Sequence, residues 1–409
     1  MPEAPVLPTQ AHGPGSLAGI RILDLTRVLA GPYCTQILAD HGAEVWKVEK
    51  PGAGDDTRAF GPPFVGGEST YFLSINRNKQ SLAIDLKDRR GRELVLQLAD
   101  KADVVVENFR PGAAARLGLG AADLRARNPR LVYCSISGFG QSGPWQDQAG
   151  YDLAVQGLSG LQSLTGDADG PPTKVGTSIA DLVSGLCAVQ GILLALWRRE
   201  RTGEGDVVDV AMLDAVASLL TYQASSFLHT GRVPHRAGNR HPSICPYETF
   251  AAQDGHFNLA VGNDNQWLRL CDVLVQPGWR TDARLATNRQ RVAHRDIVFT
   301  MLTEAFAVKP VAEWLAVLQA AGVPCGAILD VGQALAHPSL RDRGMVVPMD
   351  HPTAGPIQVP GIAIKLQEAP GSVRTPPPTL GQHTDAVLAD VLGLASGQLT
   401  ALRAAGVLG

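Results

Sequence analysis

Residues 19–51 read GIRILDLTRVLAGPYCTQILADHGAEVWKVEKP, and they set the architecture of the N-terminal half. Two apolar runs, 19–25 and 43–51, have the composition of short buried strands. Between them lie a turn at 26–32 and a helical pattern at 33–42 that ends at Gly42. A strand, a helix and a second strand in this order predict parallel neighbours joined by a crossover helix.

The same alternation continues to residue 140. Further strands are predicted at 81–88, 103–109 and 131–140, with helices at 90–102 and 122–129 between them. Strands that alternate with helices predict an α/β fold built on a Rossmann-like parallel sheet.

The remaining chain predicts a second, smaller α/β domain joined to the first by long linkers. Residues 229–250 are rich in Gly, Pro, His and Arg, as expected of a linker, and helix and strand patterns resume after them. A β-hairpin is predicted at 351–366, and a Pro-rich strap with a helix at 373–393. We therefore expect a flexible N-terminal arm (1–17), a large domain (18–228), a linker with the small domain (229–330), and a return strap whose C-terminal helix packs on the large domain (331–409).

Composition narrows the class of protein. Of 409 residues, 45% are hydrophobic and 18% charged, with a net charge of −3, which is typical of a globular chain. There is no long basic run, so no nucleic-acid partner is expected. No apolar run reaches the roughly 18 residues of a membrane span, so no membrane partner is expected either. The scattered cysteines and the lack of a signal peptide favour a reducing, cytoplasmic location. Because His229, His235 and His241 lack zinc-site spacing, no metal is expected.

The predicted strand ends carry cations and tight turns. In parallel sheets, ligands bind beyond the carboxyl ends of the strands. The segments at those ends are 27–32, 49–51, 85–87, 107–112 and 137–140. Together they favour a phosphate-bearing ligand. The first turn holds Gly31 alone and lacks the G-x-G-x-x-G pattern, and no Walker-type loop is present, so neither NAD binding nor ATP hydrolysis is expected.

Asp181 is the candidate reactive carboxylate. It lies at the start of an apolar helix within 174–203, in which the leucines and valine at 182, 186, 189, 193 and 196 have the spacing of one buried face. From position alone, Asp181 suits a helix cap, since Ser178-x-x-Asp181 resembles a capping box. A carboxylate can also attack an activated acyl group such as a thioester, with helix N–H groups holding the oxyanion.

Several segments taken in order resemble the family III CoA-transferases, also called the CaiB/BaiF family. They include LDLTRVLAGPYCTQILADHGAEVWKVEKPGAGD, NRNKQSLAIDLK, ADVVVENFRPGAAARLG, SGFGQSGPW, GYDLAVQGLSGL and GTSIADLVSG. The resemblance extends from about residue 18 to the end of the chain.

This resemblance implies a nucleophilic role for Asp181. Attack on an acyl-CoA thioester gives a mixed anhydride and free CoA, an aspartyl-CoA thioester follows, and the acceptor acid leaves as the new CoA thioester. Coenzyme A is then a substrate, and no permanently bound cofactor is expected. Lys50 stands where the family commonly has Arg, which puts a bidentate phosphate contact there in doubt. The implied CoA contacts are Leu29, Ala30, Lys50, Ile84, Asp85, Leu86, Lys87, Asn108, Phe109, Arg110, Arg116, Gln148, Ala149, Gly150 and Tyr151.

The resemblance also bears on alternatives and substrates. Related α-methylacyl-CoA racemases carry a His base where this chain has Tyr151, and tyrosine is a poor base at neutral pH, so transfer is favoured. A CoA-thioester hydrolase or a non-catalytic CoA-binding protein stays open. The chain looks similar to the succinate and glutarate branch, in which Arg236, Arg240 and His241 either hold a distal carboxylate or solvate a hinge loop. The Gly-rich lid of formyl-CoA:oxalate transferases is missing, which disfavours oxalate. An interlocked homodimer is implied.

Overall fold

The computed structural model describes residues 15–409 as two compact units. The first combines the described residues up to Leu161 with Val175–Tyr222 and Pro338–Gly409, and the second combines Gln162–Lys174 with Gln223–His337. The large domain expected at 18–228 and the strap expected at 331–409 fall mainly in the first unit. The small domain expected at 229–330 lies in the second. Most of the arm expected at 1–17 lies outside the described residues.

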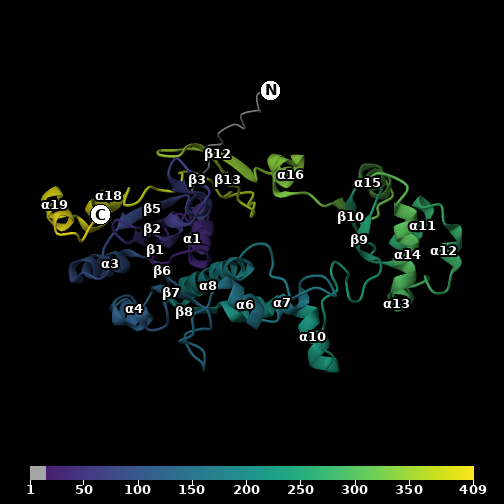
Figure 1. Cartoon of the computed structure of the whole chain (residues 1–409). Helices are drawn as coiled ribbons and strands as arrows, with labels where there is room; N and C mark the ends of the chain where they lie inside the picture. The colour runs from purple at the N-terminus through teal and green to yellow at the C-terminus, as the bar shows by residue number, and fades with distance from the viewer. Residues whose placement is uncertain (1–14) are drawn as a thin grey trace. The chain divides into compact units, whose positions relative to one another are not determined.

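A six-stranded parallel sheet forms the centre of the first unit (Figure 1). The neighbours in the sheet follow the order β5-β2-β1-β6-β7-β8, and every pair is parallel. This is the doubly wound order in which the chain first builds outward to one side and then crosses to the other. The predicted Rossmann-like fold is thus confirmed. The strands are β1 (Arg21–Asp24), β2 (Glu44–Glu49), β5 (Lys79–Ala83), β6 (Val104–Glu107), β7 (Val132–Ser137) and β8 (Val207–Ala211).

Both faces of the sheet are covered by helices, as a parallel sheet requires. Side chains alternate along each strand, so Ile22 faces one layer and Leu23 the other. The layer around Ile22 contains α1 (Ala30–Asp40) and α8 (Ile179–Thr202). The layer around Leu23 contains α3 (Arg89–Lys101), α5 (Ala121–Arg127), α18 (Thr384–Leu392) and α19 (Ser396–Ala404).

Helix α8 differs in part from its prediction, since Val189 and Leu196 are buried as expected and Leu182 is half-buried. Leu186 and Leu193 were expected in the core but are exposed. The buried face consists mainly of small residues, Ala180, Ser184, Gly185, Ala188 and Ala195, because small side chains let α8 approach α1 closely. By length and composition α8 could cross a membrane, which corrects the expectation that no such apolar stretch exists. Since part of α8 packs in this core, the stretch is weak support for a span.

The second unit is built on a small antiparallel sheet. Its order is β11-β10-β9, formed by Cys325–Ala327, His256–Ala260 and Tyr247–Ala251. Phe306 is at the centre of an aromatic core, and its ring packs edge to face with the rings of Phe257 and Trp314. The helices are α11 (Asp264–Val273), α12 (Pro277–Thr281), α13 (Asn288–Ala293), α14 (Arg295–Phe306), α15 (Val311–Ala320) and α16 (Val331–Ala336).

The C-terminal segment returns to the large sheet. Its hairpin pairs β12 (Val346–His351) with β13 (Gly355–Pro360), so the prediction of 351–366 was shifted toward the C-terminus. The strap then runs along β5, where the Ser81 N–H donates to His383 Nδ1 (3.2 Å). This pairing covers the edge of the sheet. The remaining elements are η1 (Asp56–Ala59), β3 (Phe64–Val65), β4 (Glu68–Ser69), α2 (Thr70–Ile75), α4 (Ala113–Arg116), α6 (Asp152–Leu158), α7 (Leu161–Leu164), α9 (Met212–Ser218), α10 (Thr221–Thr230) and α17 (Pro338–Asp342).

Candidate active site

The strand order reverses between β1 and β6, which places a crevice at their carboxyl ends. Two pockets in the first unit open at this edge, and Arg27 and Phe109 line both. The first, here called the β2–β5 pocket, has a volume of about 340 Å³. It is lined by Leu25, Thr26, Arg27, Lys47, Val48, Glu49, Lys50, Gly54, Asp55, Ile84, Asp85, Leu86, Lys87, Phe109 and Leu117.

The second, here called the Asp181 pocket, has a volume of about 210 Å³. It is lined by Arg27, Val28, Ala30, Asp56, Asn108, Phe109, Arg110, Pro111, Ile136, Ser137, Gly138, Gln148, Ala149, Gly150, Tyr151, Asp181 and Met212. The two pockets thus bring together all the predicted CoA contacts except Leu29, which is buried, and Arg116, which lines neither.

The predicted phosphate-binding cations are exposed at these pockets. Lys50 and Lys87 line the β2–β5 pocket and Arg110 lines the Asp181 pocket. None of the three, nor the exposed Arg116, makes an ion pair within residues 15–409. A cation without a protein partner is suited to an anionic ligand.

Two glycines position the segment Gln148–Tyr151. A side chain on Gly138, just after β7, would come within 2.7 Å of the Gly150 Cα, so only glycine allows this backbone contact. The contact places the segment over the end of β7, where Tyr151 is 73% exposed.

Asp181 lies in the first turn of α8, close to the start of α1. Burial and the nearby Asp152 carboxylate raise its pKa to about 7, against a hydrogen bond from the Ala30 N–H that lowers it. A helix N-terminus favours an ionised carboxylate, but here desolvation and the like charge of Asp152 outweigh the helix N–H groups. At neutral pH the carboxyl is poised between its protonated and ionised forms.

The cap of α8 also differs from the prediction. Ser178 makes no side-chain cap hydrogen bond, so the predicted capping box with Asp181 is wrong. Instead Asp152, the first residue of α6, accepts the Ala180 N–H at 2.8 Å. Asp152 is thus a second carboxylate near Asp181, and the sequence alone did not predict it. Tyr71 on α2 is a further neighbour. Burial raises the pKa of its phenol most, and the charge of Asp181 raises it further.

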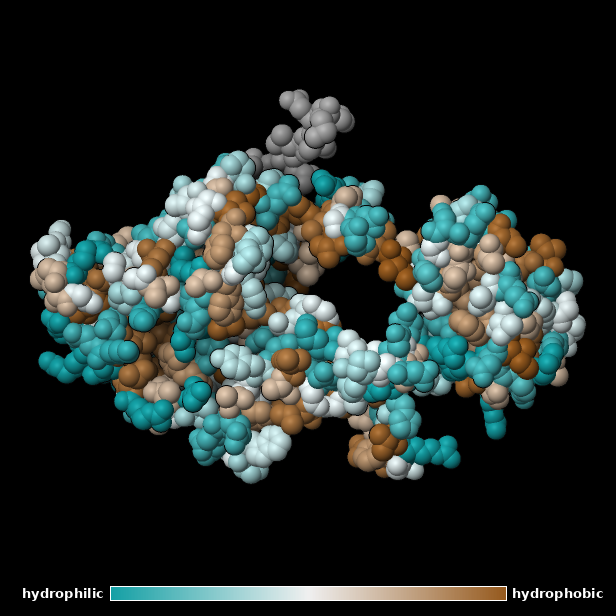
Figure 2. Space-filling model, in the orientation of Figure 1, coloured by the Kyte–Doolittle hydropathy of each residue, from teal (hydrophilic) through white to brown (hydrophobic). Residues whose placement is uncertain are grey.

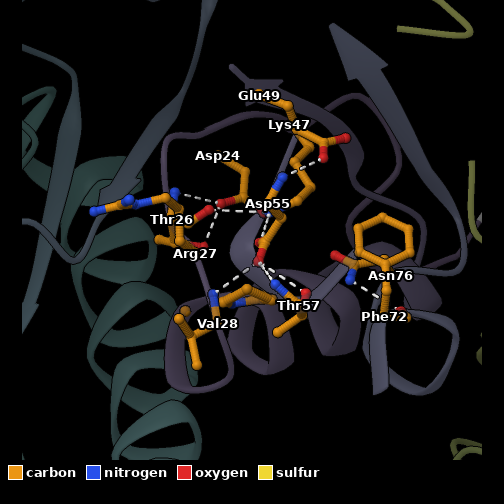
Figure 3. Close-up of polar contacts among 12 residues, drawn as sticks. Asp24, Thr26, Arg27, Val28, Lys47, Glu49, Asp55, Thr57, Phe72 and Asn76 are labelled. Carbon is orange, nitrogen blue, oxygen red and sulfur yellow. Dashed lines mark hydrogen bonds and ion pairs between the residues drawn. The ribbon is translucent and has the colours of Figure 1, made fainter. Parts of the chain in front are cut away.

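A buried ion network supports the strand ends beneath the pockets (Figure 3). Lys47 and Asp55 form an ion pair of 2.8 Å with both side chains fully buried, and Lys79 pairs with Asp24 at 3.3 Å. Burial alone raises the pKa of Asp55, but Lys47 and hydrogen bonds from Thr57 lower it to about 2. Asp55 is therefore ionised at all physiological pH values.

The three residues predicted to hold a distal carboxylate line neither pocket and belong to the second unit. Arg236 donates to the carbonyl oxygens of Gly170 (2.8 Å) and Asp167 (3.3 Å). Arg240 pairs with Glu248 at 2.8 Å, and His241 Nδ1 accepts the Ser243 N–H. Both arginines thus have partners within their own unit.

Comparison with known proteins agrees with the resemblance read from the sequence. The family model described as CoA-transferase family III matches residues 17–384. Succinyl-CoA:glutarate CoA-transferase of Mus musculus is 43% identical over 392 residues, covering 96% of this chain and 90% of that protein. Acetyl-CoA:oxalate CoA-transferase of Acetobacter aceti is 44% identical over 359 residues, covering 88% and 91%. A CAIB/BAIF family protein from Brucella suis has a TM-score of 0.82 and 40% identity, covering 93% of this chain and 100% of that one. The chain belongs to CoA-transferase family III.

Proposed function

We propose that this CoA-transferase moves CoA from an acyl-CoA thioester to a free dicarboxylic acid, with Asp181 as the nucleophile. One observation carries the proposal. Asp181 lines a pocket that shares Arg27 and Phe109 with an apolar pocket whose rim holds unpaired cations. A CoA thioester has the matching arrangement, with phosphates and adenine at one end and the acyl group at the other.

In the proposed reaction, the ionised Asp181 attacks the thioester carbonyl and CoA leaves as a thiolate, which gives an aspartyl–acyl anhydride. The thiolate attacks the aspartyl carbonyl, releases the donor acid and forms an aspartyl-CoA thioester. The acceptor carboxylate attacks that carbonyl and again displaces the thiolate. Finally the thiolate attacks the acceptor acyl group, which leaves as the new CoA thioester and restores the Asp181 carboxylate. No net proton transfer is needed, so Asp181 acts as a nucleophile and not as a base.

For the nucleotide end of CoA, the β2–β5 pocket offers both kinds of contact. Val48, Ile84 and Leu86 provide an apolar surface for the adenine ring. Lys50 and Lys87 are exposed at the rim, where charged hydrogen bonds to phosphate oxygens are strong. CoA is a substrate in this proposal, and no permanently bound cofactor is included.

The acceptor class rests on the relatives. The mouse protein is named for succinate and glutarate, and the Acetobacter aceti protein for oxalate, all of which are dicarboxylic acids. The prediction that Arg236, Arg240 and His241 bind the distal carboxylate stays a prediction, as does the argument against oxalate. A panel of glutarate, succinate, oxalate and butyrate as acceptors separates these cases, with glutarate and succinate expected to react faster than oxalate and butyrate.

We also propose a homodimer in the cytoplasm. Four large apolar side chains of α8 are exposed, with Leu194 at 69% and Trp197 at 64%, alongside Leu186 and Leu193. Hydrophobic residues lie exposed among polar ones on the face shown in Figure 2. The four exposed apolar side chains of α8 form a stripe on a core helix, which favours an interface with a second copy of the chain. The six unpaired cysteines support a reducing compartment.

The central test is covalent labelling. Incubation with succinyl-CoA and no acceptor is expected to modify Asp181, detected by peptide mass spectrometry after hydroxylamine treatment, and to release CoA only stoichiometrically. Asp181→Asn should remove the label and the transfer activity, whereas Asp169→Asn, at an exposed turn, should keep both. Sustained CoA release without acceptor would show a hydrolase and refute the transfer proposal.

A further inference from the structure

The loop of residues 25–29, which joins β1 to α1, contains an unusual backbone conformation. Val28 has φ = +69°, in the left-handed region. A β-branched residue is a rare exception there, and such strained positions persist only when their surroundings hold them. The loop contains no glycine that would adopt this conformation freely, so contacts from other elements must hold it.

Asp55 makes the contact at the strained residue itself (Figure 3). Its Oδ1 accepts the Val28 N–H at 3.2 Å and the Thr57 hydroxyl at 2.8 Å, while its Oδ2 accepts Lys47 Nζ at 2.8 Å. Lys47 Nζ also donates to the Thr26 carbonyl oxygen at 3.0 Å. The buried Lys47–Asp55 pair therefore holds both ends of the segment Thr26–Val28.

Asn108 holds the residue between them. Its side chain accepts the Arg27 N–H at 2.9 Å and donates to the Arg27 carbonyl oxygen at 2.7 Å. Since Asn108 follows β6 and Asp55 follows β2, the loop is fixed from the two strands that flank β1 in the sheet.

The loop ends where α1 meets Asp181. Ala30, the first residue of α1, lines the same pocket as Asp181, and its N–H lowers the pKa of that carboxyl group. A side chain on Gly185, one turn after Asp181, would come within 2.7 Å of the Ala30 carbonyl oxygen, so α8 and the start of α1 are in close contact. The position of the Ala30 N–H relative to Asp181 thus depends on the loop that precedes it.

We propose that Asp55 is a positioning residue for Asp181. By holding Val28 in its left-handed conformation, Asp55 keeps the Ala30 N–H directed at the carboxyl group that carries the acyl and CoA groups. This proposal rests on the proposed nucleophilic role of Asp181. It assigns a purpose to the strain at Val28, because a loop relaxed to negative φ would withdraw the N–H from the site.

The test compares Asp55→Asn with Asp40→Asn. Asn at 55 replaces one carboxylate oxygen by an NH2 group, which cannot accept from Lys47 Nζ or from the Val28 N–H. One of these two contacts is therefore lost, and the buried ion pair that holds the loop is broken. Asp40 is a matched control, because it is also buried and ion-paired, with Arg77 at 2.6 Å, but at the far end of α1.

For Asp55→Asn, kcat is expected to fall on the order of 10- to 100-fold, while the KM for succinyl-CoA stays within about threefold. The acid limb of kcat/KM is expected to move to higher pH, because Asp181 loses a hydrogen bond to its ionised form. The other groups that face Asp181, namely Asp152 on α6 and Tyr71 on α2, are unchanged. Asp40→Asn should lose stability without moving the acid limb.

A double-mutant cycle with Val28→Gly tests the proposed route. Glycine adopts positive φ without strain, so the Asp55→Asn, Val28→Gly enzyme should regain about tenfold in kcat over Asp55→Asn alone. Independent, multiplicative effects of the two substitutions would overturn the proposal. If Asp55→Asn does not fold, Thr57→Val removes only one hydrogen bond to Asp55 and should lower kcat severalfold with the same shift of the acid limb.

An unchanged acid limb and kcat in both Asp55→Asn and Thr57→Val would also overturn the positioning role, with Asp181→Asn still inactive. If Asp181→Asn retained turnover, the nucleophile itself would be wrong. The two failures are therefore distinguishable.

Discussion

Replacing Asp181 by Asn is expected to stabilise the folded protein, and to do so more at alkaline than at acidic pH. The reason lies in the raised pKa of Asp181, which burial and the Asp152 charge bring from 3.8 to about 7. An ionised carboxylate that is held near a second one lowers the free energy of unfolding of the protein. Asn at this position removes the charge and therefore this destabilisation.

The pKa shift sets both the sign and the size of the effect. Because the folded state binds the proton more tightly than the unfolded state, the stability contribution is full below about pH 4 and is lost as pH rises to about 7. A shift of about three pKa units, at about 1.4 kcal/mol each, corresponds to about 4 kcal/mol in total. The interval from pH 5 to pH 7 covers two pH units of this range, so the free energy of unfolding falls by about 3 kcal/mol across it.

Urea unfolding of the wild type and of Asp181→Asn, followed by tryptophan fluorescence at pH 5 and pH 8, measures this quantity. The free-energy advantage of the variant is expected to be about 3 kcal/mol larger at pH 8, and the intrinsic effect of the amide cancels in the difference. Asp169→Asn, at an exposed turn, should show no such change. An equal advantage of Asp181→Asn at both pH values would refute the inference that burial and Asp152 keep Asp181 poised near neutrality.

Further predictions concern the acid limb, CoA affinity and assembly. Asp152→Asn keeps an oxygen for the Ala180 N–H but removes the charge, so the acid limb of kcat/KM should move below pH 7; no movement would show that Asp152 does not act on Asp181. Replacing Lys50 and Lys87 together by Gln should raise the KM for succinyl-CoA about tenfold and weaken its dependence on ionic strength, and a salt dependence equal to wild type would contradict their contact with phosphate. Leu194→Glu places a charge on the exposed apolar stripe of α8 and should shift the protein toward monomer in light scattering; an unchanged mass would exclude this stripe as the dimer contact.

The strands and crossover helices of the first unit were predictable because each depends on local patterns. The runs 19–25 and 43–51 correspond to β1 and β2, and their apolar residues face both helical layers. The hairpin near the C-terminus was placed too late, since β12 begins before the predicted stretch and its turn lies at 352–354. On α8, periodicity identified only part of the buried face. Val189 and Leu196 are buried, but Leu186 and Leu193 are exposed, because small residues pack closest to α1.

The residues of the candidate site were predictable in part. Cations at strand ends and the family motifs pointed to Lys50, Lys87, Arg110 and Asp181, which line two pockets that share residues. Asp55 was missed although it follows the second strand within the run GAGDD, and an acid just beyond a strand end could have drawn notice. Its importance depends on a buried lysine in β2 and on the φ of Val28, neither of which has a local signature.

Local pattern was enough to predict alternating strands and helices, an acid at a helix start, and a resemblance to one family, since these depend on residues close together in the chain. The chemical state of Asp181 depends instead on groups that folding brings together. The Ala30 N–H from α1 lowers its pKa, and Asp152 from α6 places a like charge nearby in a partly desolvated pocket. Because a pKa is set by burial and by charges across space, its value near 7 arises only once β1, α1, α6 and α8 are packed around the same strand ends.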